Sequence, residues 1–419
     1  MMQRLDMQRD GRLTQAFHLG NAVHSASFWI WCALLSFPLM TVERNSADST
    51  LAYQVVGLLQ YSVIAFAVHR ARLVLAPTRF DKLQWLVLAV IVFSLALQFH
   101  GDEGAVAAGI AYTILLLAEV LLLSLIWTMP PEEIERCLAG VALVLAVFGI
   151  SAIALLGWPE ERNVGGIHPN FFGTIVLIGF IFSLFRKSAA MSAARLVCFG
   201  LAAIVSSRFA VIGCIIALLV YEATCKPRLY RLAALACAGG VLVLLFSGQI
   251  ADVLALSDPD RGLGSGFTGR DNEWSLALDS IARDPFGVGF KRQPTDVAGH
   301  NGYLKTMIEL GIPGGSIMIA AMLCIVVRAV FDAAVLSGGR DADLQRFASA
   351  RAAGLAALTF ASFFQPQIFN FGDIHGISFM LLLFSPPPGG SRERPAFGVD
   401  RRRAPGLARV ASPRVVTVR

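Results

Sequence analysis

The sequence is short of charge and of long polar stretches. Only 15% of its 419 residues are Asp, Glu, Lys or Arg, whereas 56% are hydrophobic, and the mean hydropathy is +0.64. Because soluble globular chains are about a quarter charged, this composition excludes an ordinary soluble enzyme. Apolar runs near the ~20 residues that cross a bilayer recur from end to end. The chain is therefore predicted to be an all-α polytopic membrane protein with about 12 transmembrane helices.

Several motifs that would indicate other functions are missing. None of the seven cysteines lies in the long polar loop and no C-x-x-C occurs, so neither a disulfide framework nor a zinc site is expected. The Gly-rich run at 258–269 has no Gly-Lys-Ser/Thr after it, so it is interpreted as a flexible connector and not as a phosphate-binding loop. No cleavable signal peptide is evident, and the first apolar run, 25–42, is predicted to be a retained anchor.

The apolar runs define one large membrane domain. Residues 1–385 are predicted to form a polytopic transmembrane domain, interrupted by a single large outer loop at about 249–301. The candidate spans are 25–42, 51–68, 83–99, 105–127, 137–157, 170–185, 193–206, 209–224, 232–248, 302–327, 347–364 and 371–385.

Basic residues indicate the orientation of these spans. If the N-terminus lies inside, the inner segments carry most of the 35 Lys and Arg residues, as cytoplasmic loops do. Both termini are then predicted to be cytoplasmic. The tail at 386–419 is rich in Pro, Gly and Arg, and it is interpreted as a disordered basic segment near anionic membrane lipid. Nucleic-acid binding is not expected, because no aromatic residues are interleaved with these arginines.

The outer loop is expected to contain one short amphipathic helix over 270–283. Trp274, Leu278 and Ile281 recur at helical spacing, with Ala277 beside them, which indicates a single apolar face. The opposite face is polar. This helix is therefore predicted to lie on the membrane surface or on the bundle of spans.

Three basic side chains near the outer surface are candidate functional residues. His300 stands immediately before the span 302–327, and a neutral imidazole can accept a proton near pH 7; a structural role is the alternative. Arg208 separates two short apolar runs, where a charge either faces a cavity or an anionic partner, or extends to the interface. Together with Arg270 it would present forked donors that suit a pyrophosphate.

Two further polar motifs are predicted at outer ends of spans. In HPNFFG, at 168–173, Asn170 is either a helix cap or a substrate contact. In FNFGDIHG, at 369–376, Asp373 and His375 are plausible residues of a site wall, without an assigned role.

The order of these motifs resembles a known family. HPNFFG is followed by SSR before an apolar run, then by R-x-x-x-W-x-x-A, DPFGVGF and GHNGYLKTMIELGIPGG. This series, over roughly 163–315, is similar to the O-antigen ligase and polymerase superfamily of bacterial inner-membrane proteins. Many members have His-His-Asn in the last block; here Gly299 stands at the first of these positions, and His300 matches the second.

The resemblance implies a GT-C-like membrane glycosyltransferase that acts at the periplasmic face. Its donor would be a glycan on undecaprenyl pyrophosphate, and its acceptor lipid A–core or a growing polysaccharide. No nucleotide sugar, cofactor or metal would be needed. His300 matches the proposed catalytic base, and Arg208 and Arg270 match the arginines proposed to hold the pyrophosphate. Asn170, Asn301 and Tyr303 are the remaining candidate substrate-binding residues.

Other functions remain open at this point. Ligase and polymerase differ only in the acceptor, and the sequence does not separate them. A membrane transporter or flippase for a lipid-linked glycan is the alternative from another class. It would be expected to show inverted repeats with helices broken at matched positions, and no such pair is visible in the sequence.

Overall fold

The structure of the protein is a computed structural model. It describes residues 80–99, much of 106–120, 131–160, 162–165, 167–225, 237, 248, 266–290, 292, 300–337, 341–366, 368–369 and 374–385. The predicted spans at 25–42 and 51–68, most of the span at 232–248, the loop at 249–265 and the tail at 386–419 lie outside the described residues.

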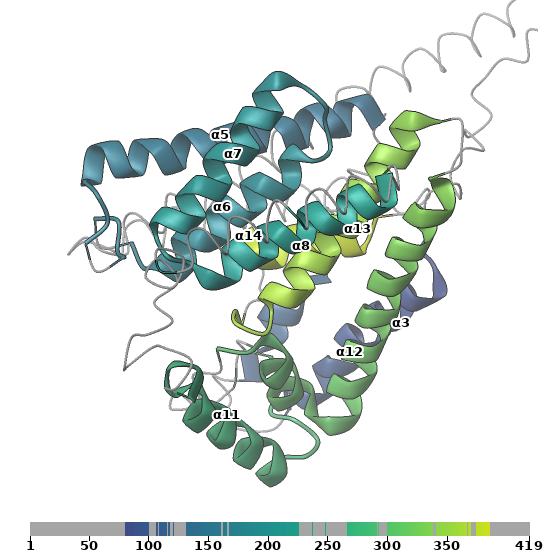
Figure 1. Cartoon of the computed structure of the whole chain (residues 1–419). Coiled ribbons are helices and arrows are strands. Elements are labelled where there is room, and N and C mark those ends of the chain that lie inside the picture. The colour runs from purple at the N-terminus through teal and green to yellow at the C-terminus, as the bar shows by residue number, and fades with distance from the viewer. Residues whose placement is uncertain are drawn as a thin grey trace, which may run out of the picture.

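Within the described ranges the fold is all-helical, apart from two isolated β-bridges between 160 and 167. The stretch from Glu132 to Leu156, α8 and α12 are long and apolar enough to cross a membrane, while α3, α6, α7 and α14 are apolar but shorter. These observations confirm the prediction of an all-helical membrane protein, whereas the number of spans stays a prediction. The helices, shown in Figure 1, are α3 (Lys82–Leu97), α5 (Pro131–Leu156), α6 (Pro169–Ser183), α7 (Ala189–Ile204), α8 (Arg208–Cys225), α11 (Gly266–Arg283), α12 (Gly302–Leu336), α13 (Ala342–Ala361) and α14 (Ile374–Leu383).

Four helices, α5, α7, α12 and α13, extend by several residues beyond the apolar runs that predicted them, and the differences are largest for α5 and α12. The span predicted at 137–157 begins at Pro131, because proline suits the first helical position and Glu132 and Glu133 suit the positive end of the helix dipole. The span predicted at 302–327 continues to Leu336. Hydropathy marks where a helix is apolar, and not where its hydrogen bonding stops.

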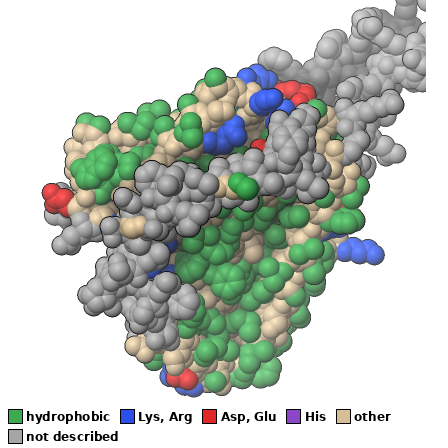
Figure 2. Space-filling model, in the orientation of Figure 1, with side chains coloured by type: hydrophobic (Ala, Val, Ile, Leu, Met, Phe, Trp, Pro, Cys, Tyr) green, Lys and Arg blue, Asp and Glu red, His purple; other side chains and the backbone are tan. Residues whose placement is uncertain are grey.

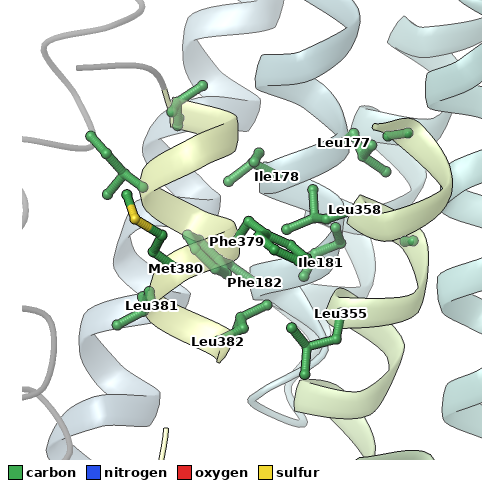
Figure 3. Close-up of a cluster of buried hydrophobic side chains, with 14 of the residues drawn as sticks. Leu177, Ile178, Ile181, Phe182, Leu355, Leu358, Phe379, Met380, Leu381 and Leu382 are labelled. Atoms are coloured by element: carbon green, nitrogen blue, oxygen red, sulfur yellow. The ribbon is translucent and has the colours of Figure 1, made fainter. Parts of the chain in front are cut away.

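Helix α13 lies in the middle of the bundle and packs against α6, α8, α12 and α14 (Figure 1). It is rich in alanine, and small side chains let neighbouring helices approach closely. A Cβ added at Gly354 would lie 2.6 Å from a methyl carbon of Leu382 and 2.7 Å from one of Ile181. Figure 3 shows the resulting cluster of buried side chains from α6, α13 and α14.

The direction of α8 relative to α13 locates one end of the bundle. Gln345, in the first turn of α13, donates from Nε2 to the carbonyl of Thr224 at 3.2 Å, near the end of α8. The two helices are therefore antiparallel. Because each rises 1.5 Å per residue, Arg208 at the start of α8 lies level with the end of α13.

Other contacts bring three more helix starts to the same end. A Cβ at Gly173 of α6 would meet Ser207, just before α8. The Gly302 N–H at the start of α12 donates to the Ser362 carbonyl at 2.7 Å, and His375 at the start of α14 lies 3.2 Å from the Ser362 hydroxyl. The starts of α6, α8, α12 and α14 thus gather around the turn after α13. We call this region the helix-start end.

At the opposite end of the bundle, ion pairs connect neighbouring helices. Arg346 of α13 lies 2.8 Å from Glu135 of α5, and Arg328 of α12 lies 3.1 Å from Asp81, which caps α3. We call this region the ion-pair end. Between the two ends, large apolar side chains are exposed, as on a surface that faces lipid. Figure 2 shows hydrophobic side chains over much of the described surface in view. Examples on α3, α5, α7 and α12 are Phe93, Val147, Leu196, Val327 and Val335.

Candidate functional site

The amphipathic helix predicted in the outer loop exists as α11, and it lies against α12 at the helix-start end. Ala277 and Ile281 form a small buried cluster with Ile308 of α12. Leu278, predicted to belong to the apolar face, is 57% exposed, so that part of the prediction is wrong. The helix also begins at Gly266, so the last residues of the predicted connector are helical. The side of α11 that meets α12 is set by Ala277 and Ile281, at i and i+4.

The turn after α11 completes the hydrogen bonds of a broken helix. Helix α12 departs from helical geometry at Gly311, and Pro313 has no N–H to donate to Glu309. The loop residue Val288 donates instead to the Ile308 carbonyl at 3.1 Å, and Gly289 donates to the Glu309 carbonyl at 2.8 Å. In return, the Ile312 N–H donates to the Pro285 carbonyl at 2.8 Å. DPFGVGF and the kink of α12 therefore form one backbone clasp.

The clasp contains three glycines with a positive φ, which are Gly287, Gly289 and Gly311. Gly287 and Gly311 have φ values of 87° and 71°, in the left-handed region that side chains disfavour. A Cβ at Gly287 would lie 2.3 Å from the Gly311 nitrogen, and one at Gly311 would lie 2.3 Å from the carbonyl carbon of Phe286. The two backbones touch, and this contact holds α11 against the first turns of α12.

Three charged or titratable side chains lie at the helix-start end. Arg270 and Glu273 belong to α11, and His300 stands just before the start of α12. Nε2 of His300 lies 3.8 Å from Oε1 of Glu273, and the two side chains are 43% and 33% exposed. The guanidinium of Arg270 lies over the ring of Phe364, 5.4 Å from its centroid. Phe364 belongs to the turn after α13, whose Ser362 carbonyl holds Gly302. The tertiary structure thus brings Arg270, Glu273 and His300 to one place.

Asn301 and Tyr303 anchor the beginning of α12. Asn301 is the N-cap: its Oδ1 accepts from the N–H groups of Tyr303 and Leu304 at 2.9 Å and 3.2 Å. The Tyr303 hydroxyl donates to the Thr359 carbonyl at 2.7 Å, and its ring packs on Phe363. Both side chains therefore fix the backbone that carries His300. A substrate contact by Asn301 would have to come from its Nδ2 group.

Arg208 and Asn170 lie at the same end of the bundle. Arg208 is the first residue of α8 and is half-buried. Asn170 is the second residue of α6, and its N–H donates to Nδ1 of His168 at 3.2 Å. His168 is therefore the N-cap of α6, and the alternative that Asn170 caps this helix is wrong. A ring nitrogen can accept the same hydrogen bond as the usual Asn or Ser oxygen.

His375, which the sequence left without a role, is fully buried. The Ser362 hydroxyl donates to the Leu358 carbonyl at 2.7 Å, so its oxygen is left to accept from Nε2 of His375 at 3.2 Å. Through Ser362, His375 holds the turn on which Gly302 is also fixed. Asp373 lies outside the described residues.

A second charged pair lies just inside the helix-start end. Lys305 and Glu309 are one turn apart on α12 and are 3.8 Å from each other, with side chains only 11% and 6% exposed. Among the described residues, no group of three or more His, Cys, Asp and Glu side chains could hold a metal ion.

Glu273 is the site residue that the sequence did not single out. Its signal was its spacing: residues three apart on a helix share a face, so Glu273 lies beside Arg270 on α11. The missing information was which residue from elsewhere in the chain would meet that face. His300 is 27 positions away, and only the clasp between α11 and α12 brings it there.

One comparison with known proteins found a match. Residues 193–319 match the family described as O-antigen ligase. This match confirms the resemblance seen in the sequence over α7, α8, α11 and the first half of α12. No curated protein matches the chain. Arg208, Arg270, Glu273 and His300 all lie inside the matched segment, whereas Asn170 lies before it.

Proposed function

We propose that this chain, with its O-antigen ligase segment at 193–319, is a membrane glycosyltransferase that moves a glycan from undecaprenyl pyrophosphate to an acceptor hydroxyl. The acceptor is lipid A–core or a growing polysaccharide. The helix-start end faces the periplasm in this proposal, the ion-pair end faces the cytoplasm, and the membrane is the bacterial inner membrane. The distribution of Lys and Arg along the chain supports this orientation.

The observation that carries the proposal is that His300 lies beside Glu273 of α11, on the face of that helix that also carries Arg270, at one end of the bundle and within the matched segment. Arg208 lies at the same end, at the start of α8. A base and fixed guanidiniums at the mouth of a helical bundle suit a substrate whose anionic headgroup lies at the membrane surface. A transporter would instead be expected to show inverted repeats, with helices broken at matched positions.

The transfer is proposed as a single displacement at the anomeric carbon. His300 takes the proton from the acceptor hydroxyl as its oxygen forms the new bond to that carbon. The bond from the anomeric carbon to the pyrophosphate oxygen breaks, and undecaprenyl pyrophosphate leaves with the electron pair. Arg270 and Arg208 stabilise the charge that develops on the leaving group. The configuration at the anomeric carbon is inverted.

The test is complementation of a strain that lacks the gene, with wild type or with His300→Ala. Lipopolysaccharide and extracellular polysaccharide are compared on gels, and the lipid-linked glycan is extracted and quantified. Loss of long chains from lipid A–core, with lipid-linked polymer accumulating, identifies a ligase. Single repeats on the core, or loss of secreted polymer with a normal core, identify a polymerase.

Two results would contradict the proposal. If deletion of the gene changes neither glycan, the proposed function is wrong and the transporter alternative is reopened. Full complementation by His300→Ala would remove His300 as the base. Membrane extracts probed for the tagged protein establish that the variant inserts normally.

A further inference from the structure

We propose that Glu273 is a positioning residue for His300, and that together they form a carboxylate–imidazole pair whose proton-accepting atom is Nδ1. This inference rests on the proposed function. It adds a residue that the sequence did not assign, and it states which nitrogen of His300 meets the acceptor hydroxyl.

The geometry of the pair carries the first step. Oε1 of Glu273 lies 3.8 Å from Nε2 of His300, and Nε2 is therefore the nitrogen that faces the carboxylate. A carboxylate has only acceptor sites, so it favours the imidazole tautomer with hydrogen on the nearer nitrogen. That tautomer leaves the lone pair on Nδ1. Hydrogen bonds of this kind are often long without substrate and shorten in the reacting complex.

The burial of one carboxylate oxygen of Glu273 carries the second step. Its Oε2 atom is buried without a hydrogen-bond partner within the described part of the chain. An unsatisfied buried carboxylate oxygen is costly, and a neighbouring cation relieves that cost. When His300 takes a proton it becomes an imidazolium beside this carboxylate. Glu273 is therefore placed to stabilise the charge that forms on His300 during transfer.

The clasp carries the third step, because it sets the distance between the two side chains. Glu273 stands one turn before Ala277, whose buried side chain packs on α12. His300 precedes Asn301, whose side chain caps α12. Backbone hydrogen bonds from Val288 and Gly289 to α12 hold together the segments that carry Glu273 and His300. Glu273 is thus presented to His300 by two helices that are bonded to each other.

In the reaction, Glu273 does not touch the substrate. The acceptor hydroxyl loses its proton to Nδ1 of His300, its oxygen bonds to the anomeric carbon, and undecaprenyl pyrophosphate departs with the bonding electrons. The imidazolium keeps its Nε2 hydrogen directed at Glu273, and it later releases the Nδ1 proton to water.

The experiment compares Glu273→Gln with Asp279→Asn, an isosteric change of an exposed carboxylate on the same helix. Transfer is measured in membranes of the deletion strain that express each variant, with the lipid-linked glycan extracted from that strain as the donor. Glu273→Gln is expected to lower kcat about 10- to 100-fold while the KM for the donor stays within about twofold. Asp279→Asn is expected to match wild type, and Glu273→Asp to recover part of the loss.

A double variant separates a positioning role from a general structural one. If Glu273 acts through His300, Glu273→Gln should have no further effect on the residual rate of His300→Ala. Equal losses in both backgrounds, or a wild-type kcat in the single variant, would overturn the inference. If instead His300→Ala itself transfers normally, the proposed base is wrong, which is a distinct result. Size-exclusion profiles in detergent check that each variant is folded.

Discussion

The two ends of the helical bundle differ in the distance and the exposure of their charged pairs. At the ion-pair end, Arg346 and Glu135 are 2.8 Å apart, and their side chains are only 19% and 13% exposed. At the helix-start end, His300 and Glu273 are 3.8 Å apart and two to three times as exposed. Charges at the first end complete each other and tie helices together. The imidazole and carboxylate at the second end are separated by more than a hydrogen-bond distance and remain partly exposed.

The backbone shows the same contrast. Capped and regular helix starts occur at both ends, but the departure of α12 from helical geometry, at Gly311, lies near the helix-start end. Backbone strain persists where surrounding contacts enforce it, and such positions cluster at functional sites. Here the enforcing contacts are the hydrogen bonds between α12 and the turn after α11. The site residues come from α11 and from the start of α12, so these hydrogen bonds keep the residues of the two segments in a fixed relative position.

The largest effect is expected from His300→Ala. Removal of a general base typically costs about 100- to 10,000-fold in rate, so transfer should fall by that factor while the protein stays folded. Initial rates in membranes, normalised to the amount of folded protein, measure the loss. Undiminished transfer would show that the helix-start end does not hold the base.

The next effect is expected from Gly311→Ala, which breaks the clasp. The new methyl group would collide with the Phe286 backbone, and left-handed strain alone costs about 1–3 kcal/mol. Displacement of α11 by about 1 Å is expected to reduce transfer up to about 100-fold, with a lower unfolding temperature in detergent. The control is Gly200→Ala on α7, where nothing lies within 4 Å of the added carbon. Normal transfer by Gly311→Ala would show that the clasp does not position the site.

A smaller loss is expected from Arg270→Lys. Lysine keeps the charge but cannot form the forked contact with a pyrophosphate, and a hydrogen bond between charged groups contributes about 1.5–3 kcal/mol. The KM for the lipid-linked donor should therefore rise about 10-fold or more. Arg283→Lys, at the exposed end of the same helix, is the matched control. An unchanged KM in Arg270→Lys would remove Arg270 from the donor site.

The smallest effect on activity is expected at the ion-pair end, from Glu135→Gln. The loss of its pair with Arg346 should lower the stability by about 1–3 kcal/mol, seen as a lower unfolding temperature in detergent. The kcat per folded molecule should not change. Glu132→Gln, at an exposed position on the same helix, provides the control, because it loses only the interaction with the helix dipole, about 0.3–1 kcal/mol. A fall in kcat with Glu135→Gln would break the contrast between the two ends.

Much of the fold followed from the sequence, because membrane helices are marked by local apolar runs. The predicted spans 170–185 and 209–224 agree with α6 and α8 to within one or two residues. Helix ends outside the apolar part were less predictable. The polar first turn of α5 carries little hydropathy signal, and in α12 the charged residues Arg328 and Asp332 interrupt the apolar run before the helix ends at Leu336.

Most residues of the candidate site were predicted one by one, but Glu273 and the arrangement of the site were not. Arg208 stood out because a charge at a membrane boundary is costly, and His300 because a neutral imidazole there can accept a proton. The buried face of α11 was only partly found, since Leu278 has the right spacing and yet points away from α12. Asn170 was offered as a cap, a position that His168 occupies. Such choices between neighbouring residues depend on which partner is close, and periodicity does not contain that information.

The sequence by itself determined that this chain is a helical membrane protein, which of its segments are apolar, and which segment carries the O-antigen ligase resemblance. These properties follow from local composition and motif order. Only the tertiary structure decided that the turn after α11 supplies hydrogen bonds to the broken start of α12, and that Glu273 meets His300. The physical reason is that a proline and a glycine in α12 leave backbone carbonyls without their helical donors. Only a distant segment that folds back onto the helix can supply them.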